Sequence, residues 1–216
     1  MVISKVHKYI YVAVDKTGTT SVEKFLMDSD ETATKNGVEI DGKQYKFKGH
    51  STALEIKAVL GKHYDDYTVI GFVRNPYSRV VSSYFFLKKG AKPWKNVDRD
   101  RPLIQKLQIK FTQIMPFKPW ALIYPYRANR IYFVGEKGNL IVDKIGIFEN
   151  LSEDLETILI SCGLNFDFSK FPHTNKSVHK EESTYFKNKI FRNAMSLKLG
   201  KDLKFYNSIE EANNSN

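Results

Sequence analysis

The sequence lacks the features that build secreted and membrane proteins. It contains one cysteine, Cys162, so no disulfide can form within the chain. No apolar run approaches the roughly 20 residues that a membrane-spanning helix needs. The segment Met1–Lys8 also lacks the apolar core of a signal peptide. Because a single cysteine suits a reducing compartment, we expect a cytoplasmic protein without stable membrane insertion.

Two glycine-rich nucleotide motifs are missing as well. The strongly β-prone stretch Tyr9–Asp15 is followed by the polar loop 16–21, and apolar residues then recur at helical spacing from Val22. This pattern predicts a strand, a tight loop and a helix. However, the loop has one glycine, and Lys16 precedes Gly18 instead of following the last glycine. The loop is therefore neither a triphosphate P-loop nor a dinucleotide fingerprint.

The loop 16–21 nevertheless predicts an anion site. The first N–H groups of a helix have no intrahelical acceptor, and the helix dipole adds partial positive charge there. The loop also supplies one lysine and several small hydroxyl side chains, which suit phosphate or sulfate. The formal net charge of +10 favours an anionic ligand without selecting one. An ordinary strand-to-helix turn is the simpler interpretation of the same pattern.

A second strand-to-helix junction follows later in the chain. The apolar run Thr68–Val73 predicts a buried strand, and Asn75 and Pro76 then open a helix that we expect to reach about residue 89. Arg74 lies between the two elements. Its planar fork can bind a terminal phosphate through two parallel hydrogen bonds. A salt bridge at the start of the helix is the structural alternative for this arginine.

Short apolar strands that alternate with helices predict an α/β protein with a central, mostly parallel sheet. We expect one domain over residues 1–209 and a disordered tail at 210–216. The proline-rich segment 91–130, which holds both tryptophans, is an excursion that forms either an acceptor site or a plain insertion. We further expect a helix at 52–60 capped by Ser51, and paired strands at 131–134 and 140–142.

Four motifs in this order resemble the sulfotransferase superfamily, whose members use 3′-phosphoadenosine 5′-phosphosulfate (PAPS). The loop 16–21 is similar to the family's 5′-phosphosulfate loop, and Val73–Ser82 is similar to its 3′-phosphate element. The segments 147–151 and 173–177 resemble the carbohydrate, family 2-like branch. The resemblance covers roughly residues 8 to 206. It implies a P-loop-like three-layer α/β/α fold and transfer of a sulfuryl group to a carbohydrate or other hydroxyl acceptor.

The resemblance also implies roles for particular residues. Lys16 stabilises the oxygen between phosphate and sulfate, and the loop amides hold the 5′-phosphate. The PAPS-binding residues implied are Lys16, Thr17, Gly18, Thr19, Thr20, Ser21, Arg74, Ser82, Lys176 and Ser177. His50 occupies the place of the general base in some relatives, and Glu55 is the alternative because other relatives use a glutamate. This scheme needs no metal ion.

One residue departs from the family pattern. Family members often have a proline before the loop lysine, whereas this chain has Asp15 there. An aspartate beside an anion site is unfavourable unless its carboxylate points away.

Three functions remain open from the sequence. The first is a PAPS-dependent sulfotransferase. The second is a nucleotide or small-molecule kinase on the same scaffold, which the position of Lys16 disfavours. The third is a basic module that binds a polyanion, although the sequence shows no basic-aromatic RNA motif, so we expect no nucleic-acid partner.

Overall fold

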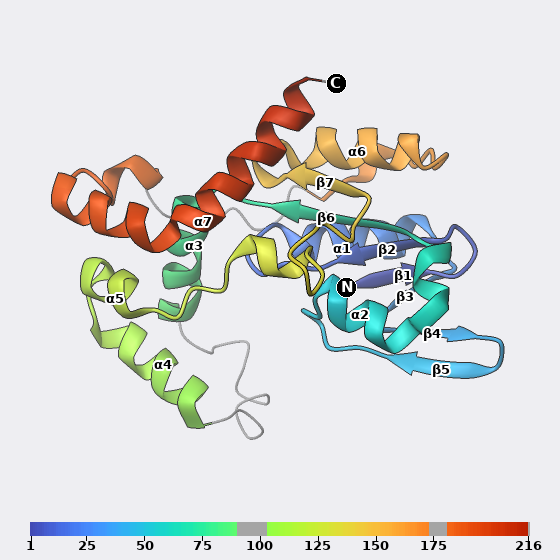
Figure 1. Ribbon diagram of the computed structural model, residues 1–216, viewed down its shortest axis with the longest axis horizontal. Coiled ribbons are helices and arrows are strands. Elements are labelled where there is room, and N and C mark those ends of the chain that lie inside the picture. The colour runs from blue at the N-terminus through green and yellow to red at the C-terminus, as the bar shows by residue number, and fades with distance from the viewer. Residues whose placement is uncertain (90–102, 173–180, 216) are drawn as a thin grey trace.

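The computed structural model describes residues 1–89, 103–172 and 181–215, and its centre is a five-stranded sheet (Figure 1). The strand order is β3-β1-β2-β6-β7. The strands are β1 (Val2–Ser4), β2 (Tyr9–Val12), β3 (Ala33–Lys35), β6 (Thr68–Val73) and β7 (Lys144–Ile147). Strands β2, β6 and β7 are parallel, and β1 is antiparallel to both β2 and β3. Four of the five strands therefore run in one direction, which confirms the predicted mostly parallel α/β sheet.

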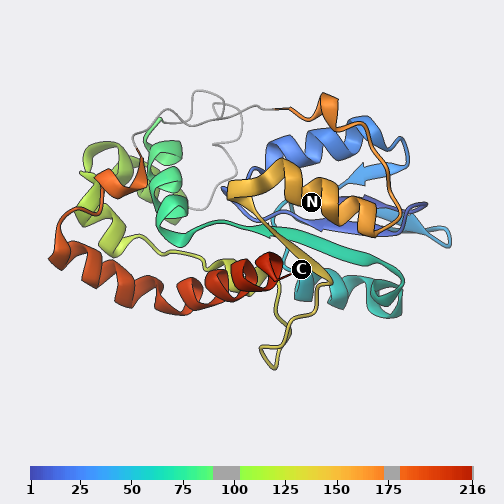
Figure 2. The same cartoon turned by 90° about the horizontal axis from the view of Figure 1, so that it is seen from above.

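Helices lie on both faces of this sheet. Helix α1 (Thr19–Ser29) and helix α6 (Leu151–Ser161) lie on one face, and α2 (Ala53–Leu60) lies on the other (Figure 2). A small hairpin of β4 (Gly37–Ile40) and β5 (Lys43–Lys46) precedes α2. Among the described residues, no helix combines the length and the apolar character that crossing a membrane would require.

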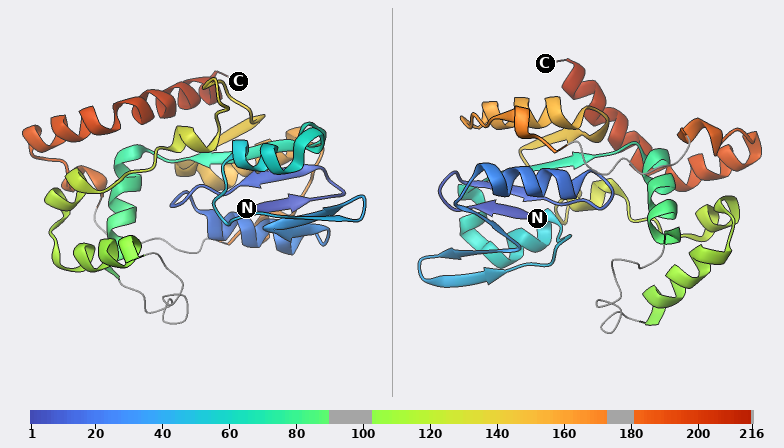
Figure 3. Two further views of the ribbon diagram at one scale, coloured as in Figure 1. Left: turned by 60° about the horizontal axis from the view of Figure 1, so that its bottom comes forward. Right: turned by 180° about the vertical axis from the view of Figure 1, so that it is seen from behind.

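A second group of helices lies beside the carboxyl ends of the parallel strands (Figure 3). It consists of α3 (Pro76–Lys88), α4 (Leu103–Ile114), α5 (Phe117–Ile123) and α7 (Lys189–Asn214). Tyr84, Trp120 and Met195 are buried in its own apolar cluster, separate from the core of the sheet. Helix α3 directly follows β6, so it connects the two parts of the molecule.

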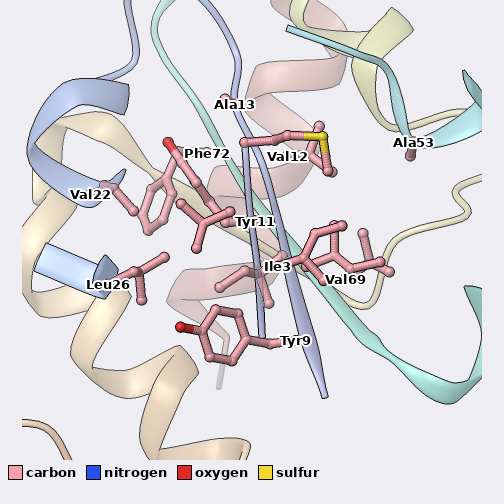
Figure 4. Packing of buried hydrophobic residues seen from close by; sticks show 14 of the residues in the cluster. Ile3, Tyr9, Tyr11, Val12, Ala13, Val22, Leu26, Ala53, Val69 and Phe72 are labelled. Atoms are coloured by element: carbon pink, nitrogen blue, oxygen red, sulfur yellow. The ribbon is translucent and has the colours of Figure 1, made fainter. Parts of the chain in front are cut away.

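The core explains why the first predicted strand is reliable. Every residue from Tyr9 to Val14 is 0% exposed, because β2 is paired on both edges and covered on both faces. A strand in such a place reads as a continuous apolar run. Figure 4 shows Tyr9 and Tyr11 on the same side of the strand as Val22 and Leu26 of α1, and Val12 on the opposite side. The strand thus anchors the loop that leads into α1.

The structure corrects the predicted strands at 131–134 and 140–142. Residues Asn129–Tyr132 form a 3₁₀ turn, and the expected pairing is reduced to one bridge between Val134 and Leu140. The strand that joins the sheet is β7 instead. Glycine has a low propensity for strands, so Gly146 weakens the sequence signal for β7. The structure requires glycine there, because a Cβ would lie 2.3 Å from the ring of Phe72.

Two helix boundaries also differ from the prediction. Helix α2 is capped by Thr52, not Ser51, and Thr52 and Glu55 form a reciprocal capping box. Helix α7 continues to Asn214, so helical structure includes most of the segment 210–216 that we expected to be a disordered tail. The side chain of Asn213 donates to the carbonyl oxygen of Ile145 at 3.1 Å, which ties this end of the helix to β7.

Candidate active site

The parallel strands β2, β6 and β7 are neighbours, so the loops that follow them meet at one edge of the sheet. Arg74, directly after β6, donates from Nη1 to the carbonyl oxygen of Lys16 at 3.0 Å. Its guanidinium carbon lies 4.2 Å from the ring centroid of Phe148, which follows β7. The structure therefore brings together the lysine and arginine that the sequence predicted for two separate anion sites.

The loop between β2 and α1 has an unusual backbone. Lys16 has φ 67° and Gly18, the N-cap of α1, has φ 74°. The left-handed conformation costs a residue with a side chain about 1–2 kcal/mol. At Gly18 there is also no room, since a Cβ would lie 2.5 Å from Leu151 Cδ2. The single glycine of the loop is thus required by both geometry and space, and Lys16 is held in a strained conformation by its surroundings.

Side-chain donors hold the carbonyl groups of this loop. His50 Nδ1 bonds the carbonyl oxygen of Ala13 at 2.8 Å. The hydroxyls of Thr17 and Thr19 donate to the carbonyl oxygen of Val14 at 2.9 and 2.6 Å. Since these two hydroxyls donate within the loop, an anion there would rely mainly on the first amides of α1, which have no acceptor one turn earlier.

The side chain of Lys16 lies in a partly buried, positively charged environment. Its Nζ is 4.0 Å from the ring centroid of Phe86 on α3. Burial and the nearby charge of Arg74 lower the pKa of Lys16 to about 8. The free protein therefore holds this lysine close to its deprotonation point, and a bound anion would stabilise the charged form.

Arg74 has an unused donor. Its Nε is buried and has no hydrogen-bond partner among the described residues. Burial lowers the pKa of the guanidinium, although the carboxylate of Glu149 acts in the opposite direction. A buried donor without an acceptor is costly, so this nitrogen is available to a ligand oxygen. Ser82, two turns into α3, is 2% exposed and lies on the inner side of the same helix.

The carboxylate of Asp15 is held by two neighbouring side chains. Its Oδ1 accepts from Nη2 of Arg79 at 2.7 Å and from the hydroxyl of Tyr132 at 2.7 Å. Burial alone would raise the pKa of Asp15, but Arg79 and these hydrogen bonds hold it below its ordinary value. These partners compensate the negative charge of Asp15, which the sequence places beside the predicted anion site. The sequence did not predict Arg79 or Tyr132 as part of the site, because only their long-range contacts reveal them.

His50 is an exposed side chain with a defined tautomer. A carbonyl oxygen can only accept, so the bond to Ala13 places the proton of the neutral ring on Nδ1. Nε2 then carries the lone pair of the neutral ring. Glu55, by contrast, accepts from the Thr52 backbone N–H at 2.7 Å within the capping box of α2. Its carboxylate therefore caps the first turn of α2. Lys176 and Ser177 lie outside the described residues.

Comparison with known proteins identifies the family of the chain. A family model described as "Sulfotransferase family" matches residues 1–209 and so includes both strand-to-helix junctions. A curated protein of Archaeoglobus fulgidus, described as an uncharacterized protein, is 31% identical over 103 residues, which are 48% of this chain and 73% of that protein. No solved structure matches the chain. The family match covers nearly the whole sequence and confirms the resemblance inferred from the motifs, so this protein belongs to the sulfotransferase family.

Proposed function

We propose that the protein uses PAPS as sulfuryl donor and transfers the group to a hydroxyl of a carbohydrate or glycan-like acceptor. The observation that carries this proposal is the pair of cationic sites, Lys16 and Arg74, on adjacent strand ends, with the Nε of Arg74 buried and unpaired among the described residues. PAPS carries negative charge at both ends of its adenosine, so it needs two such sites. The proposed fold is the P-loop-like three-layer α/β/α arrangement, in one domain over residues 1–209.

The two sites have different roles in this proposal. Arg74, with Ser82, binds the 3′-phosphate through its unused donor. The amides at the start of α1 bind the 5′-phosphate. Lys16 neutralises the charge that grows on the oxygen between phosphate and sulfur as the bond breaks. Lys176 and Ser177 are proposed as further nucleotide contacts on the strength of the sequence motif alone.

The reaction is an in-line displacement at sulfur. The acceptor oxygen forms a bond to sulfur, the bond from sulfur to the bridging oxygen breaks, and adenosine 3′,5′-bisphosphate leaves. The acceptor proton moves to Nε2 of His50, whose Nδ1–H is already bonded to Ala13. The protein contributes mainly position and charge, by analogy with phosphoryl transfer. No step in this scheme requires a metal ion.

The carbohydrate acceptor is proposed from the motif resemblance and from chemistry. A net charge of +10 favours acidic or sulfated glycans. The rings of Phe117 and Trp120 are buried in an apolar cluster, so they do not support stacking on a sugar. The single cysteine suits work in the cytoplasm.

Calorimetric titration tests the donor site directly. Adenosine 3′,5′-bisphosphate, 5′-AMP and ATP·Mg are titrated into the wild type, Arg74→Ala and the control Arg192→Ala, which changes an exposed arginine of α7. A charge-assisted contact contributes about 1.5–3 kcal/mol, so the bisphosphate should bind about 10–150 times more tightly than 5′-AMP. Arg74→Ala should erase that preference, and Arg192→Ala should retain it.

The opposite result is equally informative. If ATP·Mg binds more tightly than the bisphosphate and Arg74→Ala changes neither ligand, the protein does not recognise a 3′-phosphate. The kinase alternative would then replace the PAPS proposal.

A further inference from the structure

A buried arginine lies beneath the loop that carries Lys16. Arg79 of α3 is 1% exposed, and all three of its nitrogens are bonded. Nε donates to the carbonyl oxygen of Asp15 at 2.9 Å, and Nη2 donates to the carboxylate of the same residue at 2.7 Å. Nη1 donates to the carbonyl oxygen of Arg127 at 2.7 Å. The guanidinium therefore holds both the main chain and the side chain of the residue that precedes Lys16.

The same polar cluster reaches the second anion site. The hydroxyl of Tyr126, 3.3 Å from Nη1 of Arg79, donates to Asp202 of α7 at 2.6 Å. Asp202 also accepts from Nδ2 of Asn129 at 2.8 Å. Asn129 in turn bonds the backbone of Arg74, accepting from its N–H at 3.4 Å and donating to its carbonyl at 3.1 Å. One continuous set of hydrogen bonds thus links the backbones on either side of the donor site.

A contribution to the stability of the fold does not by itself account for this cluster. Replacing a buried ion pair with packed apolar residues is often neutral or stabilising, so such a pair is weak evidence for a stabilising role. Its location is specific, however. Lys16 holds a left-handed φ of 67°, and the carbonyls of residues 15 and 16 are each bonded by an arginine, Arg79 and Arg74 respectively. These two hydrogen bonds therefore hold the carbonyl groups before and after the φ torsion of Lys16.

We infer that Arg79 and Asp15 form a latch that fixes the left-handed conformation of Lys16 and so aims its ammonium group at the transferred sulfuryl group. The statement about sulfuryl rests on the proposed function, whereas the statement about loop conformation does not. Arg79 is a positioning residue in this scheme, since it acts through Asp15 and the loop backbone. Asp15 fixes the loop in this scheme and makes no contact with the sulfuryl donor.

The test compares Arg79→Lys and Asp15→Asn with the wild type and with Lys198→Met. Lysine keeps the charge but loses the fork, and asparagine keeps the shape but loses the charge. Lys198→Met is the control for a merely structural loss, because Lys198 bonds three carbonyl oxygens at the end of α5. Two readouts are needed: amide hydrogen exchange of the segment 13–18, and kcat with KM for PAPS at saturating acceptor. Asp15→Asn keeps the test open if Arg79→Lys does not fold.

The latch predicts local loosening and a loss confined to turnover. In both latch variants, exchange should accelerate in segment 13–18 and stay unchanged in β6, and kcat should fall about 10–100-fold while KM for PAPS changes little. The double variant should lose no more than the worse single variant, because the two residues act as a unit. Lys198→Met should keep its kcat and the exchange of segment 13–18.

Unchanged exchange in segment 13–18 in both latch variants overturns the inference, as does a kcat within twofold of wild type. If the wild type transfers no sulfuryl group at all, the proposed function fails, and hydrogen exchange alone still decides whether the latch exists.

Discussion

The two junctions proposed to bind anions differ in the groups that they offer to a ligand. The first junction, residues 15–21, relies on backbone amides, two left-handed residues and a lysine whose pKa is lowered to about 8. The second, residues 74–82, relies on an arginine side chain and on a regular helix start with Asn75 as cap and Pro76 in the first turn. Arginine keeps its charge at any pH that the protein meets. The charge of the first junction therefore depends on pH near 8, whereas the charge of the second does not. We call the first junction adjustable and the second permanent.

This difference matches a division of labour. A group that stabilises a leaving oxygen gains by interacting more strongly in the transition state than in the ground state. A group that recognises a terminal phosphate contributes the same binding energy throughout the reaction. Substitutions in the first junction should therefore lower kcat, whereas the Arg74→Ala substitution already described should act on binding.

Replacing Lys16 should have the largest effect on catalysis. Lys16→Met removes the positive charge beside the bridging oxygen, and loss of one such stabilising group typically lowers kcat about 10²–10³-fold. The affinity for adenosine 3′,5′-bisphosphate should change far less, because Arg74 and the loop amides remain. Steady-state kinetics and calorimetry measure the two quantities separately.

Lys24→Met is the matched control for this substitution. Lys24 is an exposed lysine of α1 that pairs with Asp28, so its removal should leave both kcat and bisphosphate affinity close to wild type. If Lys16→Met weakens bisphosphate binding as strongly as it lowers kcat, the proposed division between the two junctions does not hold.

His50→Gln tests the proposed base, with a loss of about 10²-fold in kcat expected because general-base help is typically worth 10²–10⁴-fold. Donor affinity should not change. Glu55→Gln is the comparison, since Glu55 belongs to the capping box of α2. Glutamine can take the place of glutamate in a capping box, so this variant should leave both the free energy of unfolding and kcat close to wild type. Thermal unfolding and initial rates report the two effects, and a reversed pattern would make Glu55 the base.

The sequence predicted the parts of the fold that are buried on both faces. The runs Tyr9–Val14 and Thr68–Val73 read as strands because the sheet surrounds them completely. It did not predict β1, which has only three residues, or β7, which contains Gly146. Gly146 lies directly against the ring of Phe72, where a side chain would not fit. Both strands depend on contacts that no local pattern records. Very short strands and glycines that face aromatic rings are therefore the expected failures of such reasoning.

The candidate site divides in the same way. Lys16, Arg74 and His50 could be found because each stands at a predicted strand end or helix start, and parallel strands bring such ends together. Asp202 could not, since it is a single acidic residue within α7, and only the fold shows that it is 2% exposed and bonded to Asn129. The residues proposed to contact a ligand were readable from the sequence, whereas those that support them were not.

The pH dependence gives the finest test of the comparison between the junctions. Because the pKa of Lys16 is lowered to about 8 in the free protein, its charged form is lost as pH rises through that value. The kcat/KM for PAPS reports groups of the free enzyme, so it should fall about tenfold per pH unit above 8. Bound donor favours the charged lysine, so the corresponding fall in kcat should lie at higher pH. Lys16→Arg should remove the fall in kcat/KM between pH 8 and 10, whatever its absolute rate. The ratio of bisphosphate to 5′-AMP affinity should meanwhile stay constant from pH 7 to 9, because Arg74 does not titrate there. A ratio that falls in parallel with kcat/KM would show that both junctions depend on one titrating group, and that the adjustable and the permanent site are not separate.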